Sequence, residues 1–515
     1  MKKMIWILLL LVSNFIIAQS NNALTKFDKV ITTKGLKEKL SIIASAEMEG
    51  RETGSPGQKR AAAYIESEFK RMGLQPGNGQ SYQQIYPVYQ DALIEKKLVI
   101  AGTSFEWDKD FKYSLQGINN GNWNFTEIVF AGYGIVDPSK NINEYENLEV
   151  KGKLVVVLDG GGSAPLNAAG GRAMFNNPAS SFAKTRTASS KGAAGLLIIS
   201  PDFPKKSPSE TKSGMYLKAS TNAGFLTVGI APEVAAKILP IVSNGKLAVA
   251  DFKDIKKANY PVAIEIAAKK ATENVESSNV IGIIPGTDKK EEYVMITGHY
   301  DHLGKRGDVI YYGADDDGSG TVSVMQIAEA FAAAAKKGKQ PRRTIVFMTV
   351  SGEEKGLWGS EYYSEHPIFP LDKTTADLNI DMVGRVDTER LTADSLNYVY
   401  VIGHDKLSTD LPIINEAANK ASSNITLDYK FDDPNDKNRI YYRSDHYNFA
   451  RKGVPILFFY DGMLLADYHK PTDTIEKINF DLMQKRVLMI YHTACEIIQR
   501  DEMLKRDLKL NMPGR

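Results

Sequence analysis

The chain has 515 residues, of which 43% are hydrophobic and 24% are charged, and its 64 basic and 62 acidic residues leave a net charge of +2. This length predicts about two to four domains, and a composition near the globular average excludes collagen, coiled coil and wholesale disorder. The near-zero net charge gives no global electrostatic case for binding nucleic acid. The single cysteine, Cys495, excludes an intramolecular disulfide and a zinc site built on cysteines. Any metal chemistry must therefore use His, Asp and Glu.

Residues 1–18 have the pattern of a secretory signal peptide. Two lysines precede an apolar run, Met4 to Val12, that is too short to span a bilayer, and the small residue Ala18 precedes polar Gln19. We expect cleavage after Ala18, export to the periplasm or the cell exterior, and no stable membrane anchor. The alternative is an uncleaved anchor.

Three regions follow the signal peptide. Residues 24–118 begin with helical patterns, such as the apolar face formed by Ala62, Ile65 and Phe69. Residues 120–270 hold short apolar runs around a Gly/Ser/Ala-rich stretch, which predicts a β-rich unit inserted in the chain. Residues 271–505 alternate between strand and helix patterns, which predicts an α/β fold with a mostly parallel mixed sheet and helices on both faces.

The elements expected in the last region are six strands and three helices, and we expect the charged tail after residue 500 to extend the final helix. The strands are predicted at 279–286, 292–300, 343–352, 376–384, 397–403 and 454–462. The helices are predicted at 319–337, 406–422 and 480–500, and an earlier helix at 58–73.

Polar side chains occur where these apolar strands end. They are His299 and Asp301 after one strand, Glu353 and Glu354 after another, Asp381, His469, and the run Asp315, Asp316 and Asp317. Ligands of open α/β sheets bind outside the carboxyl ends of the strands. We therefore expect these motifs, distant in sequence, to converge on one edge of the sheet.

The residue types at this edge suit a zinc site. Two histidines and several carboxylates, without a thiol, are ligands that zinc accepts. The adjacent carboxylates Glu353 and Glu354 repel each other in a cleft unless a cation offsets them. His299 and Asp301 share a face of an extended chain, so Asp301 can accept the second ring N–H of a metal-bound His299. Asp317 has another interpretation, as a cap of the helix that follows it.

The remaining histidines have simpler interpretations. His302 is expected beside the site or on the surface, His366 and His404 in loops, and His492 within the final helix. His446 is interpreted as structural.

The motifs GHYDHLG, GADDDGSG, SGEEKGLWGS, NIDMVG, YYRSDHYNF and DYHKPTDT, in this order, resemble the co-catalytic di-zinc aminopeptidases. Their superfamily includes glutamate carboxypeptidase, glutaminyl cyclase and the transferrin receptor ectodomain. The resemblance covers about 275–500. The segments FAGYGI, NLEVKGKLVVV and SSKGAAGLLIIS resemble a protease-associated (PA) domain, and EMEGRETGSPGQKRAAAYI resembles the start of the peptidase domain. The resemblance therefore implies a peptidase domain split into 24–118 and 271–505 by a PA domain at 120–270.

The resemblance also implies roles for individual residues and a requirement for two zinc ions per chain. One zinc would be held by His299, Asp315 and Asp381, and the other by Asp315, Glu354 and His469, with Asp315 bridging. The same comparison implies that Glu353 is the general base, that Asp301 orients His299, that a cis peptide joins Asp315 to Asp316, and that Tyr441 stabilises the oxyanion.

The function expected from these observations is that of a secreted zinc aminopeptidase, which hydrolyses N-terminal residues from peptide substrates with Glu353 as base. A carboxypeptidase of the same fold would need a basic pocket, for which Arg443 and Arg385 are candidates. A glutaminyl cyclase, which uses one zinc, or a non-catalytic binding ectodomain would also be compatible with this fold. The oligomeric state, the preferred N-terminal residue and the role of the inserted region stay open.

Overall fold

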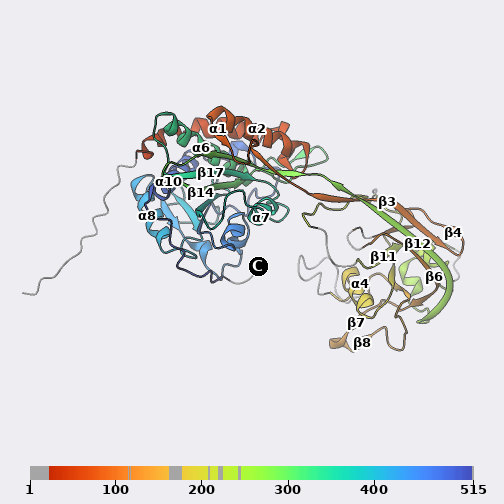
Figure 1. Ribbon diagram of the computed structural model, residues 1–515. Coiled ribbons are helices and arrows are strands. Elements are labelled where there is room, and N and C mark those ends of the chain that lie inside the picture. The colour runs from red at the N-terminus through yellow and green to blue at the C-terminus, as the bar shows by residue number, and fades with distance from the viewer. Residues whose placement is uncertain are drawn as a thin grey trace, which may run out of the picture. The chain divides into compact units, whose positions relative to one another are not determined.

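The computed structural model describes residues 23–113, 115, 118–161, 177–206, 209–218, 224–241 and 245–512. The chain forms two compact units, one made of Met1–Tyr86 and Glu276–Arg515 and the other of Pro87–Val275 (Figure 1). We call them the main unit and the inserted unit. The predicted signal peptide lies outside the described residues, and none of the helices within them is long and apolar enough to cross a membrane.

The main unit is built on a mixed sheet in the order β1-β13-β17-β14-β18-β21-β19-β20, with β2 paired to β13. The central strands β17, β14, β18 and β21 are parallel, whereas β13 and β19 run antiparallel to their neighbours β17 and β21. The predicted mostly parallel mixed sheet is therefore confirmed. Its strands are β1 (Gln75–Pro76), β2 (Gln83–Tyr86), β13 (Ser277–Ile284), β14 (Lys289–His299), β17 (Arg343–Val350), β18 (Thr374–Ile380), β19 (Tyr398–Ile402), β20 (Thr426–Asp428) and β21 (Ile456–Tyr460). A small hairpin, β15 (Lys305–Arg306) and β16 (Val309–Ile310), lies outside it.

Helices cover both faces of this sheet, because successive residues of a buried strand point to opposite sides. On β17, Ile345 and Phe347 pack into the core with the first set of helices. Val346 and Met348 pack into a second core, on the side of the second set. The first set is α1 (Thr33–Ile43), α2 (Pro56–Met72), α6 (Gly320–Lys336), α8 (Asp410–Ala421) and α10 (Phe480–Gln499), and the second is α7 (Trp358–Glu365) and α9 (His446–Ala450).

Local signals set the ends of these helices. Helix α2 begins after Ser55, whose hydroxyl accepts a hydrogen bond from the Gln58 amide, and it ends at Gly73, whose φ of 86° is left-handed. The prediction that the tail extends the last helix is wrong. Helix α10 ends at Gln499, Arg500 is extended, and Leu504 of the tail is buried in the core.

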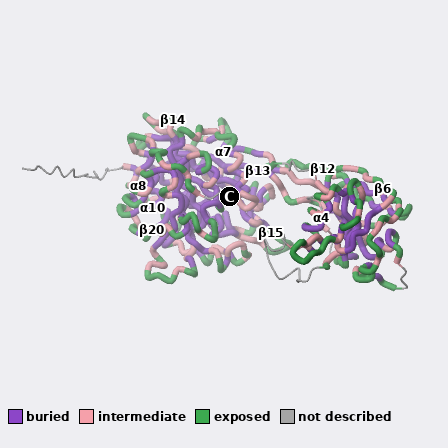
Figure 2. Tube along the Cα trace, turned by 90° about the horizontal axis from the view of Figure 1, so that it is seen from below, coloured by how far each residue is buried: buried purple, intermediate pink, exposed green. Residues whose placement is uncertain are grey.

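The inserted unit is a β-rich unit on a sheet in the order β4-β3-β12-β6-β9-β10-β11-β5, and it has its own buried interior (Figure 2). Within this sheet β6, β9, β10 and β11 are parallel. Its elements are β3 (Tyr89–Ile100), β4 (Thr103–Ser104), β5 (Phe111–Tyr113), β6 (Gly121–Phe130), β7 (Val136–Asp137), β8 (Ile142–Asn143), β9 (Leu154–Leu158), α4 (Ser181–Ser190), β10 (Gly195–Ile199), β11 (Thr227–Ile230), α5 (Pro232–Ala235) and β12 (Ala258–Asn274).

The inserted unit begins at Pro87, not at residue 120 as predicted, and ends at Val275, not at 270. The reason is a long pair of strands. β3 pairs with β12 from Tyr89 opposite Asn274 to Ile100 opposite Ile264, so residues 89–100 belong to the inserted sheet.

Candidate metal centre

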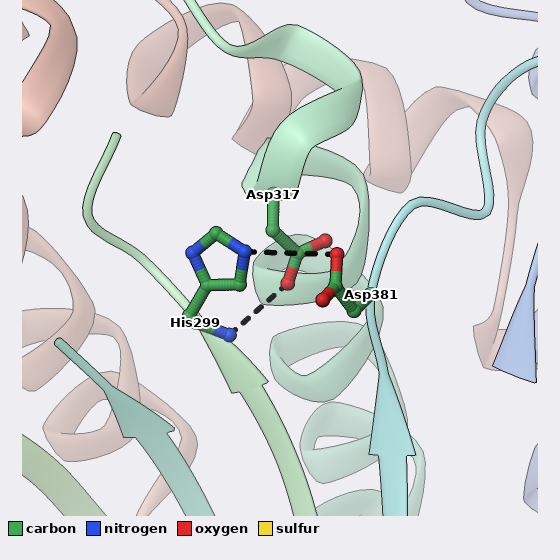
Figure 3. Close-up of side chains that lie close together, drawn as sticks. All are labelled: His299, Asp317 and Asp381. Atoms are coloured by element: carbon green, nitrogen blue, oxygen red, sulfur yellow. Dashed lines mark hydrogen bonds and ion pairs between the residues drawn. The ribbon is translucent and has the colours of Figure 1, made fainter. Parts of the chain in front are cut away.

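Three parallel strands bring the predicted polar residues to one edge of the main sheet. His299 is the last residue of β14, Glu353 and Glu354 follow β17, and Asp381 follows β18. Because β14 pairs with both β17 and β18 in parallel, these side chains emerge at the same level. Figure 3 shows His299 and Asp381 pointing toward each other across the strand ends, with Asp317 reaching in from the turn that precedes α6.

The Asp316 carboxylate lies between the two predicted histidine ligands. Its Oδ1 is 3.3 Å from Nε2 of His299, and its Oδ2 is 3.2 Å from Nε2 of His469. The other oxygen–nitrogen separations complete two groups: Asp381 Oδ1 lies 3.6 Å from His299 Nε2, and Glu354 Oε2 lies 3.1 Å from His469 Nε2. Asp316 thus lies close to both histidines, with Asp381 close to His299 and Glu354 close to His469.

The prediction that Asp315 occupies this central position is wrong. Asp315 Oδ1 accepts a hydrogen bond of 2.8 Å from the Gly384 amide. Burial and the neighbouring carboxylates of Asp461 and Asp473 raise the pKa of Asp315 well above its usual value. The cis peptide also lies one residue later than expected, between Asp316 and Asp317.

The physical reason is the irregular backbone of the turn Ala314–Ser319. Asp316 and Asp317 have non-helical φ/ψ values of −98°/101° and −113°/51°. Adjacent side chains therefore point in different directions, and three consecutive aspartates have three separate environments. No periodic pattern can assign them from the sequence.

Asp317 caps the helix that follows it, which is one of the two interpretations that the sequence allowed. Its Oδ1 accepts hydrogen bonds from Gly320 N at 2.7 Å and Met382 N at 3.0 Å, and its Oδ2 accepts one from His299 N at 3.0 Å (Figure 3). Gly320 is the first residue of α6. The carboxylate of Asp317 therefore ties the helix to the ends of β14 and β18.

His302 is a part of the cluster that the sequence left undecided. It is fully buried, and its Nδ1 lies 2.8 Å from Glu354 Oε1 and 3.9 Å from Asp316 Oδ2. The only sequence signal was its proximity to His299. His302 therefore supports the Glu354 side of the cluster.

Charge accumulates in this buried cluster. Burial lowers the pKa of His469, but the nearby carboxylates of Asp316 and Glu354 overcome this and raise the pKa to about 10. Burial, together with the charges of Glu354 and Asp381, raises the pKa of Glu353 well above its usual value, although His299 opposes the shift. So many carboxylates in a low dielectric require cations, either protons or metal ions.

The cluster fits metal ions on two counts. Several of its buried ring nitrogens and carboxylate oxygens have no hydrogen-bond partner among the described residues, namely His299 Nε2, His302 Nδ1 and Nε2, Asp316 Oδ2 and Glu354 Oε1. Buried lone pairs without partners are costly unless something binds them. In addition, the separations of 3.1–3.6 Å between facing ligand atoms match those of atoms bound to one tetrahedral zinc ion, about 3.3 Å for bonds of about 2.0–2.1 Å.

A segment from the N-terminal part of the chain holds this edge in place. The guanidinium of Arg51 is fully buried and donates hydrogen bonds to the carbonyl oxygens of Ile43, Tyr300, Tyr312 and Gly313. Two of these acceptors directly follow His299 or precede Ala314. Arg51 therefore fixes both loops that carry cluster residues, and the sequence analysis did not identify it.

Asp301 lies beside His299, but its carboxylate is not the nearest acceptor. His299 Nδ1 is 3.0 Å from the backbone oxygen of Asp301 and 3.7 Å from its carboxylate. The carboxylate accepts hydrogen bonds from the Thr53 hydroxyl at 2.7 Å and from the Glu353 amide at 3.2 Å. Asp301 therefore orients His299 through its carbonyl and positions Glu353 through its side chain.

The structure does not bring Tyr441 to the cavity beside Glu353. Its ring packs against Tyr442, His446 and Tyr447, and the cavity is lined instead by Tyr460 and Tyr468. His446 has the structural role predicted for it: its Nε2 lies 2.8 Å from the Tyr441 carbonyl, and burial lowers its pKa to about 3.

The main unit is thus an α/β fold whose mixed sheet ends in a buried cluster of histidines and carboxylates that fits metal ions. Residues 279–494 match the model of Peptidase family M28.

The chain is also similar to individual proteins with known names. The chain is 28% identical over 235 residues to "Probable leucine aminopeptidase" of Arthroderma otae, a match that covers 45% of this chain and 60% of that relative. It is 25% identical over 365 residues to "Aminopeptidase YwaD" of Bacillus subtilis, covering 69% and 73% of the two chains. The solved aminopeptidase from Aneurinibacillus sp. strain AM-1 is 18% identical, with a TM-score of 0.51 over 96% of this chain and 100% of that one, which supports the fold.

Proposed function

We propose that this protein is a zinc-dependent aminopeptidase with two metal ions per chain. The observation that carries the proposal is the position of Asp316, with one oxygen 3.3 Å from His299 Nε2 and the other 3.2 Å from His469 Nε2. A carboxylate placed in this way can bridge two ions. The zinc peptidase family of the region 279–494 supports the choice of metal and reaction.

Each ion would have its own ligands in addition to the shared Asp316. His299 and Asp381 would hold one, and Glu354 and His469 the other. When bound, a pair of zinc ions lowers the pKa of a water molecule and polarises the scissile carbonyl. His302, in contact with Glu354, would keep that carboxylate oriented.

Glu353 would act as the general base. It lines the cavity next to the cluster, and its Oε2 lies 3.9 Å from His299 Nε2. In its ionised form this carboxylate can accept the proton of the attacking water. The same carboxyl group then returns the proton to the leaving amine. Its neighbour Glu354 contacts two histidines instead, which separates the roles of the adjacent glutamates.

The substrate's free α-amine would meet the carboxylates of the cluster, so the enzyme would act on N-termini. The test is one peptide in three forms: free, N-acetylated and C-amidated. We expect acetylation to lower kcat/KM by about a thousandfold or more, because a polar site that loses its partner rejects the analogue strongly, and amidation to have little effect. Cleavage of the acetylated form, with loss on amidation, would indicate a carboxypeptidase.

The products and the zinc content of the purified protein distinguish an aminopeptidase from a glutaminyl cyclase. A cyclase converts an N-terminal glutamine without releasing an amino acid, and one zinc is enough for it. Release of free amino acids from peptides by protein containing two zinc ions per chain would support the aminopeptidase over the cyclase and over a non-catalytic ectodomain.

We also propose that residues 1–18 direct export, to the periplasm or the cell exterior, and that the inserted unit is a PA domain. Its parallel strands β6, β9, β10 and β11 and its motifs FAGYGI, NLEVKGKLVVV and SSKGAAGLLIIS support the second assignment. N-terminal sequencing of protein secreted by the native host tests the first: a mature chain that begins at Gln19 is expected, and an intact Met1 would contradict it.

A further inference from the structure

The cavity beside Glu353 contains polar groups that the proposed reaction does not use. It is lined by residues of the metal cluster, by apolar side chains and by three further polar side chains, Arg443, Tyr460 and Tyr468. The apolar lining residues are Met382, Ile440, Phe458 and Leu464.

Arg443 is a cation without an acidic partner. Its guanidinium donates a hydrogen bond of 2.9 Å to the Tyr468 hydroxyl, and across the described residues no ion pair joins it to a carboxylate within 4.0 Å. Arg385, the other basic candidate, is neutralised instead by Asp467 at 2.8 Å and Asp473 at 3.9 Å. Of the two arginines, Arg443 is therefore the one available to a ligand.

Tyr460 adds an unpaired buried donor to the same cavity. Its side chain is 3% exposed, and its hydroxyl has no hydrogen-bond partner within the part of the chain that the structure describes. Its ring stacks on Phe458 at 5.7 Å, which fixes its direction. A buried hydroxyl without a partner is costly, unless it serves a ligand.

Negative charge in the same cavity makes the positive charge of Arg443 important for an anionic ligand. Glu353 and Asp381 line the same cavity and would repel an anionic ligand. The guanidinium of Arg443, which lines the same cavity, offsets that repulsion and offers parallel N–H groups to a carboxylate. The apolar lining residues suit the methylene groups of a short side chain.

We propose that Arg443 and Tyr460 bind a carboxylate group of the substrate and make the enzyme selective for acidic substrates. This inference rests on the proposed aminopeptidase function and names its substrate class. The carboxylate has two possible sources, the side chain of an N-terminal Glu or Asp, or the C-terminal α-carboxylate of a short peptide. Both present the same group to Arg443.

The first arm of the test uses the 4-nitroanilides of Glu, Gln and Leu, which have a free α-amine and no C-terminal carboxylate. Glu and Gln have the same shape and differ in charge. We expect wild-type enzyme to favour Glu over Gln by about tenfold or more in kcat/KM, chiefly through KM, since one partnered polar group gives this scale of discrimination. In Arg443→Met the ratio should fall to near one, with the Glu substrate losing at least ten times more than the Leu substrate.

Two further variants sharpen this arm. Tyr460→Phe removes only the unpaired hydroxyl, so it should lower the Glu/Gln ratio by about threefold and raise the melting temperature slightly. Arg451→Met is the matched control, because Arg451 follows α9, is exposed and does not line the cavity. Its Glu/Gln ratio should equal that of the wild type.

The second arm compares the dipeptide Leu-Gly with its C-terminal amide. A preference for the free form that disappears in Arg443→Met assigns the carboxylate to the substrate's C-terminus, whereas a preference for Glu in the first arm assigns it to the side chain. Absence of both preferences overturns the proposal. An equal loss on all substrates in Arg443→Met also overturns it, because Arg443 would then act in the chemistry.

Failure of the aminopeptidase function is recognised separately, as the absence of turnover with every substrate. In that case the carboxylate site is tested by calorimetry, with L-glutamate and L-glutamine titrated into zinc-loaded protein. Tighter binding of glutamate that is lost in Arg443→Met sustains the carboxylate site, and equal binding of the two amino acids overturns it.

Discussion

The main and inserted units both contain parallel strands, yet within the described residues only the main unit gathers histidines and carboxylates at its strand ends. In the main unit, β14, β17 and β18 end in a cluster of histidines and carboxylates. In the inserted unit, β9 ends beside the buried ammonium of Lys184, whose hydrogen bonds go to the carbonyl oxygens of Leu158 and Gly160. All seven histidines of the chain lie outside residues 87–275.

The difference shows that parallel strands bring residues to one edge of a sheet, and that the identity of those residues determines whether a functional site forms there. Several buried polar atoms of the main cluster have no hydrogen-bond partner among the described residues, whereas the buried cation of the inserted unit is satisfied by backbone carbonyls. We therefore expect changes in the main unit to affect metal binding and turnover, and changes in the inserted unit to leave both intact.

The largest effect should come from the bridging residue. Asp316→Asn removes a charged ligand shared by two ions, so it should abolish stoichiometric zinc binding and lower kcat/KM by at least about a thousandfold. Asp315→Asn is the matched control, since its side chain bonds to the Gly384 amide, and it should keep its zinc. Zinc content by elemental analysis and kcat/KM measure both variants. Zinc loss confined to Asp315→Asn would restore the assignment made from the sequence.

The next effect separates chemistry from metal binding within the main unit. Glu353→Gln keeps the shape of the side chain but removes the proton acceptor, so kcat should fall by about a hundredfold or more while zinc stays bound. Glu354→Gln should instead weaken zinc affinity, because Glu354 contacts His302 and His469. Metal titrations and steady-state kinetics test the pair. Near-normal turnover of Glu353→Gln would show that another group is the base.

A smaller effect is expected from the residue that braces the main site. Arg51→Lys keeps the charge, but one ammonium group cannot reach the four carbonyl oxygens that Arg51 bonds. We expect zinc affinity or kcat/KM to fall by about 10–100-fold, the usual cost of losing a group that orients metal ligands. Arg60→Lys is the control, because this arginine forms an exposed ion pair with Glu49. Equal, small effects of both variants would mean that Arg51 does not position the site.

The smallest effect on activity should come from the inserted unit. Burial lowers the pKa of Lys184 to about 8, below the usual lysine value of about 10.4. Between these pH values the unfolded chain binds more protons at this residue than the folded chain, so the free energy of unfolding rises with pH, by on the order of 3 kcal/mol in total. Lys184→Met lacks this rise.

The melting temperature of the wild type should therefore increase relative to Lys184→Met from pH 7 to pH 10. Zinc content and kcat/KM should be the same in both proteins, because none of the described residues of the inserted unit belongs to the cluster. A constant difference in melting temperature would show that the folded-state pKa of Lys184 is not lowered. A loss of zinc in Lys184→Met would show that the inserted unit also affects metal binding.

Sequence patterns correctly predicted the position of residues that lie in, or directly after, a regular helix or strand. The apolar strands that end at His299 and Ile380 predicted which residues reach the sheet edge, because the direction of a parallel strand determines where its carboxyl end lies. Helix α2 was predicted by its apolar face and its terminal glycine, Gly73. These features are local, so they can be read from a single stretch of sequence.

The features that were missed depend on irregular backbone or distant contacts. Asp315 and Asp316 are chemically identical neighbours, and only the non-helical turn that holds them selects Asp316. Arg51 acts through carbonyl oxygens up to 262 residues away. The predicted start of the inserted unit was too late because β3 (Tyr89–Ile100) is mostly exposed or half-buried, and only its pairing with β12 assigns it to the inserted sheet.

The central claim is that Asp316 bridges two metal ions at the carboxyl edge of the main sheet. Anomalous diffraction from crystals of zinc-loaded protein, recorded above and below the zinc absorption edge, tests it most directly. We expect two peaks on either side of the Asp316 carboxylate, about 3.5–4 Å apart, one beside His299 and Asp381 and the other beside Glu354 and His469. A single peak in zinc-replete crystals, or a peak coordinated by Asp315 in place of Asp316, would contradict it.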